Sequence, residues 1–554
     1  MSRKTYFILF LCGLILPSIL AQFQPKPGYL DSEYYYAGGI QLATGNGFTE
    51  PYLWNYLDGT KSLPHPSHTY WMPLASIISA IPMWLFNDTS YAVARIPFII
   101  IAALAVPVTA HLAYLFSKRK DLAIISALFA IFSVYHAPFV GVTDNFSLFM
   151  LFGGLYFIVV TKLLPHPNLL LKGEGTQTPF PLQRGRAGNG GQNKYFFILG
   201  ILSGLLSLSR SDGLLWLGIT FLFIVFQVTK KTQPSISNLQ SLISNYASRI
   251  MLHASLSLLG FLLIMSPWYA RNLNAFGTLM APGGSRALWL QNYDQTFIYP
   301  PEALTKESFL EYGWENIWND RVWAISNNLQ SGFAAHGGII LFPFILAGII
   351  YFRKDERVKL AIIAWLILFF VMTFIFPFAG VRGAFFHAGA ALQPIWWTLA
   401  PLGLDSILAS LRKRNWGDER GRIIFTSSLV LVTIILTFFV VYIRIFQLGW
   451  GEGETNYVQV EQLLKDKGIQ AQDAVIVWDA PLYYLDTGRS ALSIPYGGTQ
   501  AILAVSEQFN ADYLVLEPEA ALGELKELLE SPNQNENFIF LGEVDDANIF
   551  KINQ

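Results

Sequence analysis

Apolar runs long enough to cross a lipid bilayer recur along most of this 554-residue chain. A hydrocarbon core about 30 Å thick requires roughly 20 apolar residues in a helix. The pattern therefore predicts a polytopic α-helical membrane protein with about eleven transmembrane helices. The predicted spans are 6–21, 91–116, 122–138, 146–164, 195–209, 213–229, 251–270, 338–352, 359–378, 387–404 and 423–446.

The charge content supports this class and excludes others. Only 14% of the residues are charged, against about 25% in soluble globular proteins. The net charge of −1 gives no basic field for nucleic acid, so we expect no nucleic-acid partner. The one cysteine, Cys12, excludes disulfides and cysteine-ligated metals. The run 6–21 is either the first membrane helix or a cleaved secretory signal, and in both cases residue 22 emerges outside.

Basic clusters fix the predicted topology, because lysine and arginine resist translocation. They occur in 117–121, 230–231, 353–359 and 412–422, which we assign to the cytoplasm. The predicted outer surfaces are then 22–90, 139–145, 210–212, 271–337, 379–386 and 447–554.

Two segments depart from the regular pattern of spans. The run 71–86 is short and contains Pro73 and Pro82, and counting it as a span would invert every later loop. We therefore predict an interfacial or re-entrant helix on the outer face. The segment 164–194 is rich in Gly, Pro and Gln without periodicity, and it predicts a disordered cytoplasmic insert.

The last hundred residues change character. Helix-like patterns at 460–468 and 519–530 alternate with strand-like patterns, which lie at 474–479, 512–517, 538–544 and 547–552. We predict a transmembrane module over 1–447, with a catalytic outer loop at 22–90 and a second outer loop at 271–337. A small extracytoplasmic α/β domain should follow over 448–554.

Ionisable residues gather at the outer ends of the predicted spans. Charges at membrane depth usually face a bundle interior or a water-filled cavity, so this distribution predicts one external cavity. The residues concerned are Asp31, Glu33, Arg95, Asp144, Arg210, Asp212, Arg271 and Arg382. His65, His68 and His387 lie near the same surfaces.

Several stretches occur in an order that resembles the GT-C superfamily of polyprenyl-phosphate-sugar-dependent glycosyltransferases. The similar branch comprises bacterial relatives of protein O-mannosyltransferases and lipid A aminoarabinose transferases. The resemblance covers roughly 1–400 and, more loosely, the C-terminal domain. The stretches are LDSEYYYAGGIQLATGNGF (30–48), YWMPL (70–74), AVARIP (92–97) and TDN (143–145).

The resemblance implies an inverting hexosyltransferase in the bacterial inner membrane, with its active site on the outer face. Its donor would be a polyprenyl-phosphate sugar, and its acceptor a hydroxyl of a protein, lipid or glycan. Asp31 would be the catalytic base or a ligand of a divalent cation, Mg or Mn, together with Asp144. Glu33 would be a second catalytic carboxylate, although Ser32 separates it from Asp31 where the mannosyltransferases have adjacent acids.

The remaining predicted site residues bind the donor. Trp71-Met72-Pro73 stands where the aminoarabinose transferases carry a phosphate-binding Lys-Pro-Pro stretch, so Arg95 and Arg271 are the predicted replacements. Arginine suits a phosphate because its planar donors bind two oxygens and stay charged. Asp144, His65, His68 and Arg382 are predicted to contact donor or acceptor, and His387 is predicted to line the cavity beside Arg382.

Each residue also has a structural interpretation. Asp31 and Asp144 sit where helix caps occur, Arg95 and Arg271 where arginines snorkel to the interface, and Arg210 with Asp212 suits a paired turn. A membrane transporter or flippase is the alternative function. It is disfavoured because no half-to-half repeat is visible and the charges cluster at one face.

Overall fold

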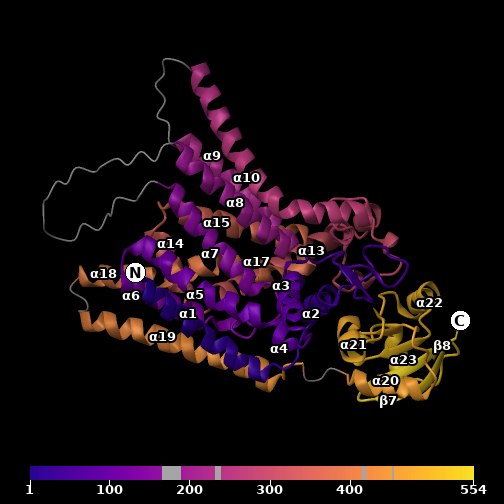
Figure 1. The fold of residues 1–554 in the computed structure, drawn as a ribbon. Helices are drawn as coiled ribbons and strands as arrows, with labels where there is room; N and C mark the ends of the chain where they lie inside the picture. Colours follow the sequence, from indigo (N-terminus) through magenta and orange to yellow (C-terminus); the bar gives the residue numbers. More distant parts are fainter. Residues whose placement is uncertain (165–188, 231–238, 415–418, 452–454, 554) are drawn as a thin grey trace, which may run out of the picture.

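A computed structural model describes residues 1–164, 189–230, 239–414, 419–451 and 455–553. Most of the predicted insert 164–194 lies outside these ranges. In Figure 1 a bundle of long helices occupies most of the molecule. The C-terminal region lies at one end of it, with its helix α21 (Ala480–Thr487) nearest to α2 (Leu30–Ala43).

Seven helices within the described ranges, taken with the short turns that continue them, are long and apolar enough to cross a membrane. Many of their large apolar side chains are exposed on the surface of the bundle, as expected of helices that face lipid. The chain is therefore a multi-pass membrane protein. The helices are α1 (Arg3–Leu20), α5 (Ile96–Ser117), α7 (Phe146–Leu163), α9 (Leu215–Lys230), α10 (Leu239–Phe276), α15 (Glu356–Phe370) and α19 (Glu419–Val441).

Four further predicted spans correspond to helices that are not both long enough and apolar enough to be counted with these seven. The 12-residue α6 and the 10-residue α14 are about 18 and 15 Å long, which is shorter than the hydrocarbon core. The count of about eleven spans therefore stays a prediction. The four helices are α6 (Lys120–Ile131), α8 (Asn189–Ser209), α14 (Phe342–Tyr351) and α18 (Gln393–Arg412).

The run 71–86 forms α3 (Leu74–Phe86), whose 13 residues reach only about 20 Å. It packs against α2, which follows α1 in the chain. The close approach depends on Gly39, where an added Cβ would lie 2.1 Å from Ser79 Oγ. Because α3 is too short to span by itself, its length agrees with the predicted interfacial or re-entrant helix.

Short elements and one longer helix build the rest of the segments between the membrane helices. A two-stranded antiparallel sheet joins β1 (Thr49–Glu50) to β3 (His65–Pro66). The helices are α4 (Tyr91–Ala94), α11 (Gly283–Arg286), α12 (Lys306–Glu311), α13 (Trp314–Ser331), α16 (Pro377–Ala379) and α17 (Phe385–Gly389).

The C-terminal region forms a mixed sheet in the order β2-β5-β4-β6-β8-β7. Its edge strand β2 (Tyr52–Leu53) comes from the first outer loop and pairs in parallel with β5. The loop predicted to lie outside (22–90) and the C-terminal region therefore share one sheet, which the sequence does not predict. The other strands are β4 (Val475–Val477), β5 (Ala491–Ser493), β6 (Tyr513–Leu516), β7 (Phe538–Val544) and β8 (Ala547–Ile552). The helices are α20 (Tyr457–Asp466), α21 (Ala480–Thr487), α22 (Gly498–Phe509) and α23 (Glu524–Glu530).

Buried carboxyl groups lie where this region meets α2. The side chain of Glu33 hydrogen-bonds Asp479, which requires a shared proton because two carboxylates would repel. Nearby, the Tyr457 hydroxyl donates to Glu517 Oε1 at 2.7 Å, and the Trp478 amide donates to Glu517 Oε2 at 3.2 Å. The pair of Glu33 and Asp479 therefore joins α2 to the C-terminal region, and the two contacts of Glu517 hold elements of that region together.

Glu517 should make the stability of this sheet depend on pH. Burial raises its pKa from 4.5 to about 8, while the Tyr457 hydroxyl acts in the opposite direction. The folded chain then keeps a proton that the unfolded chain loses, so the free energy of unfolding falls as pH rises from about 4.5 to about 8. We expect a loss of about 2–4 kcal/mol, measured by hydrogen exchange of β4 and β6 amides with correction for intrinsic rates.

The control is Glu517→Gln, which keeps the shape of the side chain and cannot ionise. Its exchange profile should lose at least half of the pH slope, with the remainder coming from the pair of Glu33 and Asp479. An unchanged slope would assign the dependence to other groups.

Candidate functional site

The first turn of α2 is held at a fixed position by the segment that follows the last span. Gly28 has φ +82°, and a Cβ there would lie 2.3 Å from the indole Nε1 of Trp450. That indole nitrogen donates to the Lys26 carbonyl at 3.0 Å. Only glycine fits this turn, and the turn sets the direction in which α2 starts. Asp31 follows in its first turn, where the helix dipole favours a negative charge.

Asp31, Asp144 and His387 form an acidic cluster, although consecutive members are 113 and 243 positions apart in the chain. Each offers a ligand atom within 4.8 Å of the others. His387 Nε2 lies 2.9 Å from Asp144 Oδ2 and 3.8 Å from Asp31 Oδ2. The Tyr29 hydroxyl also donates to Asp144 Oδ2 at 2.6 Å. Asp144 is fully buried, whereas the side chain of Asp31 is 24% exposed.

The ring of His387 is oriented from two sides. Its Nδ1 lies 2.9 Å from the carbonyl oxygen of Gly383, which can only accept, so Nδ1 carries a hydrogen. The ring also stacks on Phe146, with centroids 4.0 Å apart. Nε2 therefore faces the two carboxylates with its lone pair or with a second proton. A metal-binding histidine typically donates its other ring hydrogen to a carbonyl in this way.

The environment shifts the pKa values of Asp31 and Asp144 in opposite directions. Burial raises the pKa of Asp31 to about 6, and the charge of His387 acts against this. Burial also disfavours the charge of Asp144, but His387 and the Tyr29 hydroxyl outweigh it and lower the pKa of Asp144. Asp144 is therefore the permanent anion of the cluster, and Asp31 is the group that exchanges protons near neutral pH.

The cluster opens into a cavity of about 950 Å³, near the upper end of the range for small-molecule sites. Asp31 and His387 lie on its wall, and Arg210, Arg382 and Arg444 bring three cations to the same space. Aromatic rings form much of the remaining surface: Tyr29, Trp54, Tyr70, Trp71, Phe139, Phe146, Tyr293, Phe376, Phe386 and Trp450.

The three arginines are held in different ways. Arg210 Nε contacts Asp212 Oδ1 at 2.9 Å, so the pair predicted as a structural turn forms, and both of its members also line the cavity. The guanidinium of Arg382 lies over the Tyr293 ring at 4.7 Å, and that of Arg444 over Phe139 at 5.5 Å. Cation–π contact orients a guanidinium without neutralising its charge.

Arg95 and Arg271, the predicted phosphate ligands, do not line this cavity. Arg95 is 3% exposed and donates to the carbonyls of Gly141 at 3.0 Å and Gln24 at 2.7 Å. Arg271 donates to the Ser67 carbonyl at 2.7 Å. Both guanidinium groups hold backbone segments together, because buried carbonyl oxygens need a donor.

The other predicted residues divide in the same way. Arg382, Asp144 and His387 meet at the cavity or its acidic cluster, whereas Glu33, His65 and His68 do not line it. Glu33 is two residues from Asp31, and residues at that spacing point to different sides of a helix.

The two histidines have structural partners. His65 pairs with Glu50 at 2.8 Å and Asp58 at 3.6 Å. His68 lies between Ser67 and Ser76, and burial lowers its pKa to about 3, assisted by the charge of Arg271.

Sequence reasoning missed the contributions of Tyr29, Arg444 and Trp450. Arg444 had a usable signal, since it is a cation at the outer end of the last predicted span, where positive charge is disfavoured. Tyr29 and Trp450 had none, because aromatic residues are common at membrane interfaces for anchoring alone.

Comparison with solved structures identifies the fold as that of GT-C glycosyltransferases, in agreement with the sequence resemblance. ArnT from Cupriavidus metallidurans, bound to undecaprenyl phosphate, is similar with a TM-score of 0.51 and 11% identity over 99% of this chain and 98% of ArnT. The Archaeoglobus fulgidus oligosaccharyltransferase tethered to an acceptor peptide has a TM-score of 0.50 and 14% identity over 100% of this chain and 74% of its own.

The same archaeal enzyme in complex with Zn and sulfate is similar at a TM-score of 0.50 and 14% identity, over 98% of this chain and 73% of its own. No protein-family model matches the chain, and no characterised protein sequence matches it significantly.

Proposed function

We propose that this protein is an inverting glycosyltransferase that moves a sugar from a polyprenyl-phosphate donor to a hydroxyl acceptor at the outer face of the membrane. The observation that carries the proposal is the acidic cluster of Asp31, Asp144 and His387 at the wall of a cavity that also holds Arg210 and Arg382. Support also comes from the fold, which is that of enzymes solved with undecaprenyl phosphate or an acceptor peptide.

Asp31 is the base of the proposed reaction. A sugar hydroxyl or serine hydroxyl is a weak nucleophile, and a carboxylate that takes its proton during attack speeds the step. Asp31 is the partly exposed member of the cluster, with a pKa near 6, so it is mostly ionised at neutral pH and reachable by an acceptor. Attack on the face opposite the phosphate in a single displacement inverts the anomeric centre.

The arginines stabilise the leaving phosphate. This group gains negative charge as the glycosidic bond breaks, and fixed cations in a cavity with little water favour that charge most strongly. Arg382 and Arg210 occupy the cavity that Arg95 and Arg271 do not reach. We therefore assign the lipid phosphate to Arg382 and Arg210, with Arg444 as a third contact.

The residues present fit a divalent cation. Asp31, Asp144 and His387 offer two oxygen ligands and one nitrogen ligand, and His387 has the tautomer and the carbonyl contact of a metal ligand. This donor set suits Mn²⁺ or Zn²⁺ better than Mg²⁺, which prefers oxygen ligands alone. When bound, the cation would neutralise phosphate charge near the cluster.

We expect Mn²⁺ to bind the purified protein and His387→Ala to weaken that binding at least about 10-fold, because a nitrogen ligand is lost. Binding is measured by electron paramagnetic resonance of free Mn²⁺, without reference to turnover. His336→Ala is the matched control, since this buried histidine lies outside the cluster and contacts Trp365 and the Phe385 carbonyl. Equal Mn²⁺ affinity in both variants would contradict the metal assignment.

The proposal includes the placement of the chain in the bacterial inner membrane. About eleven helices would cross it, counting the shorter α6 and α14, with the basic segments 117–121 and 412–422 in the cytoplasm. The cavity of the module 1–447 and the sheet of the region 448–554 would then both lie on the outer side of the membrane. Because β2 belongs to that sheet, the two parts act as one unit around α2.

The test uses the full-length protein in nanodiscs with a panel of radiolabelled polyprenyl-phosphate sugars, including a mannose-like hexose. Release of free polyprenyl phosphate, even as slow hydrolysis without acceptor, would support the transferase and identify its donor sugar. If no member of the panel is bound or cleaved, the proposed function is wrong and a transporter becomes the better hypothesis.

A further inference from the structure

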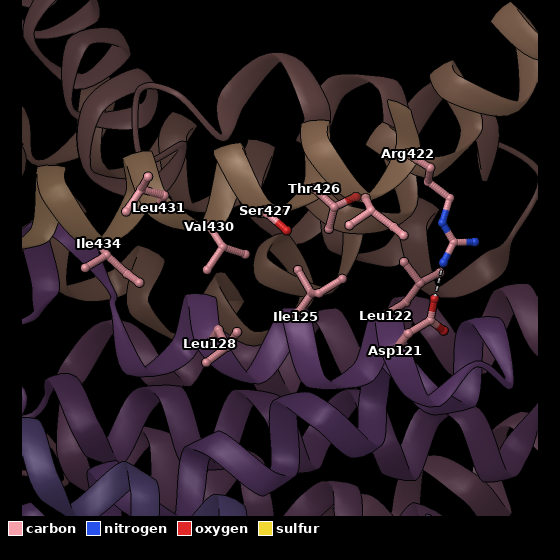
Figure 2. A pocket seen from close by; sticks show the side chains of 11 residues that line it. Asp121, Leu122, Ile125, Leu128, Arg422, Thr426, Ser427, Val430, Leu431 and Ile434 are labelled. Atoms are coloured by element: carbon pink, nitrogen blue, oxygen red, sulfur yellow. Dashed lines mark hydrogen bonds and ion pairs between the residues drawn. The ribbon is translucent and has the colours of Figure 1, made fainter. Parts of the chain in front are cut away.

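A second hollow lies between α6 and α19, away from the acidic cluster. It has a volume of about 380 Å³ and is lined along α6 by Leu122, Ile125 and Leu128. Along α19 it is lined by Ile423, Thr426, Ser427, Val430, Leu431 and Ile434. Figure 2 shows the two helices as walls, with apolar side chains along most of the length and Arg422 and Asp121 together at one end.

The helix α19 contacts the bundle at both of its ends, beyond the hollow. Near the outer end the Val134 amide donates to Thr437 Oγ1 at 3.2 Å, and an apolar cluster that includes Val441 and Ile445 packs there. At the opposite end Arg422 contacts Asp121 at 2.6 Å. Both helices belong to the membrane part of the chain, so lipid tails are the molecules available to fill the space between these contacts.

The length of the hollow matches one leaflet. Arg422 and Ile434 are 12 positions apart on one helix, which is about 18 Å at 1.5 Å per residue. One leaflet of a hydrocarbon core is about 15 Å thick. A single acyl chain therefore fits along the hollow when its headgroup lies at the level of Arg422.

The charge at that level favours an anionic headgroup. Arg119 contacts Asp121 at 2.5 Å and Asp405 at 2.7 Å, and Arg422 contacts Asp121, so two arginines and two aspartates balance each other. Lys118 and Lys120 flank this network, and both are exposed. The end of the hollow is therefore net positive, and its arginines are 24–30% exposed, within reach of a phosphate.

We propose that this groove between α6 and α19 binds an anionic phospholipid from the leaflet opposite the acidic cluster, which the basic loops assign to the cytoplasmic side. One acyl chain lies along Ile125, Leu128, Val430 and Ile434, and the phosphate meets Arg422 and the two lysines. Basic pockets between transmembrane helices on the cytoplasmic side bind such headgroups. The bound lipid fills the gap behind the helix that leads to Arg444 and Trp450 at the cavity. The proposal does not depend on the transferase activity.

The test is native mass spectrometry of the full chain in detergent, titrated separately with dioleoyl phosphatidylglycerol and dioleoyl phosphatidylcholine. We expect the wild type to bind phosphatidylglycerol at least about 10-fold more tightly, because the two nearby lysines attract its anionic headgroup. Ser427→Phe fills the groove and should lower that affinity at least 10-fold. Ser428→Phe is the matched control, because Ser428 is exposed and outside the groove.

A second variant keeps the test independent of packing. Lys118→Gln with Lys120→Gln changes only exposed side chains, and it should reduce the preference for phosphatidylglycerol to within about 3-fold of phosphatidylcholine. The proposal is overturned if Ser427→Phe binds phosphatidylglycerol as Ser428→Phe does. Equal affinity of the wild type for the two lipids would overturn it as well, because the basic residues would then not favour an anionic headgroup.

Discussion

Asp31→Asn should lower the rate of sugar transfer by about 10²–10⁴-fold, the contribution of a positioned general base. The amide has the shape of the carboxylate but cannot accept the acceptor's proton. Measured without added divalent cation, donor affinity should change little, since Arg382 and Arg210 remain in the cavity. The measurement is the single-turnover rate with the labelled donor, with donor affinity determined separately for each variant.

Glu33→Gln is the matched control for this experiment. It makes the same chemical change two residues later in the same helix, where the side chain is buried against Asp479 and away from the cavity. We expect Glu33→Gln to keep at least about a third of the wild-type rate, because the amide can still hydrogen-bond Asp479. Turnover of Asp31→Asn within about 10-fold of wild type would exclude Asp31 as the base.

The contrast between these neighbours shows what a sequence can specify. The resemblance selects the first outer acid, but only the helix that starts at Leu30 decides which of Asp31 and Glu33 reaches the cavity. The number and length of the apolar runs likewise predict a membrane bundle, since length and hydropathy are local properties. That Tyr52 and Leu53 become an edge strand of the C-terminal sheet depends on contacts more than 400 residues apart, which no local pattern carries.

The arginines also show that a sequence does not specify tertiary contacts. Charge at the outer ends of the predicted helices singles out Arg95, Arg210, Arg271 and Arg382. From the sequence, Arg95 and Arg271 are the predicted phosphate ligands and Arg210 a structural pair with Asp212, because a sequence does not show burial or tertiary partners. The structure separates them by what they contact: carbonyl oxygens for Arg95 and Arg271, and an open cavity for Arg210 and Arg382. Tertiary packing thus distinguishes a structural arginine from one available to a substrate.

Arg382→Gln should raise the donor KM by about 10–100-fold. A hydrogen bond between a guanidinium and a charged phosphate is worth about 1.5–3 kcal/mol, and glutamine replaces neither the charge nor the paired donors. Arg210→Lys should have a similar effect. It keeps a cation beside Asp212, so the buried aspartate is not left alone, while the planar two-donor contact to phosphate is lost.

Arg271→Gln is the matched control, because it removes the same charge from the same outer region without touching the cavity. Because Arg271 does not line the cavity, we expect an unchanged donor KM, and the lost hydrogen bond to the Ser67 carbonyl should cost about 1–2 kcal/mol in stability. The measurements are donor KM and thermal unfolding for all three variants. A raised donor KM in Arg271→Gln together with a normal donor KM in Arg382→Gln would contradict this assignment. The phosphate would then bind at Arg271, as predicted from the sequence. The cavity of Asp31 and His387 would then have to serve the acceptor alone.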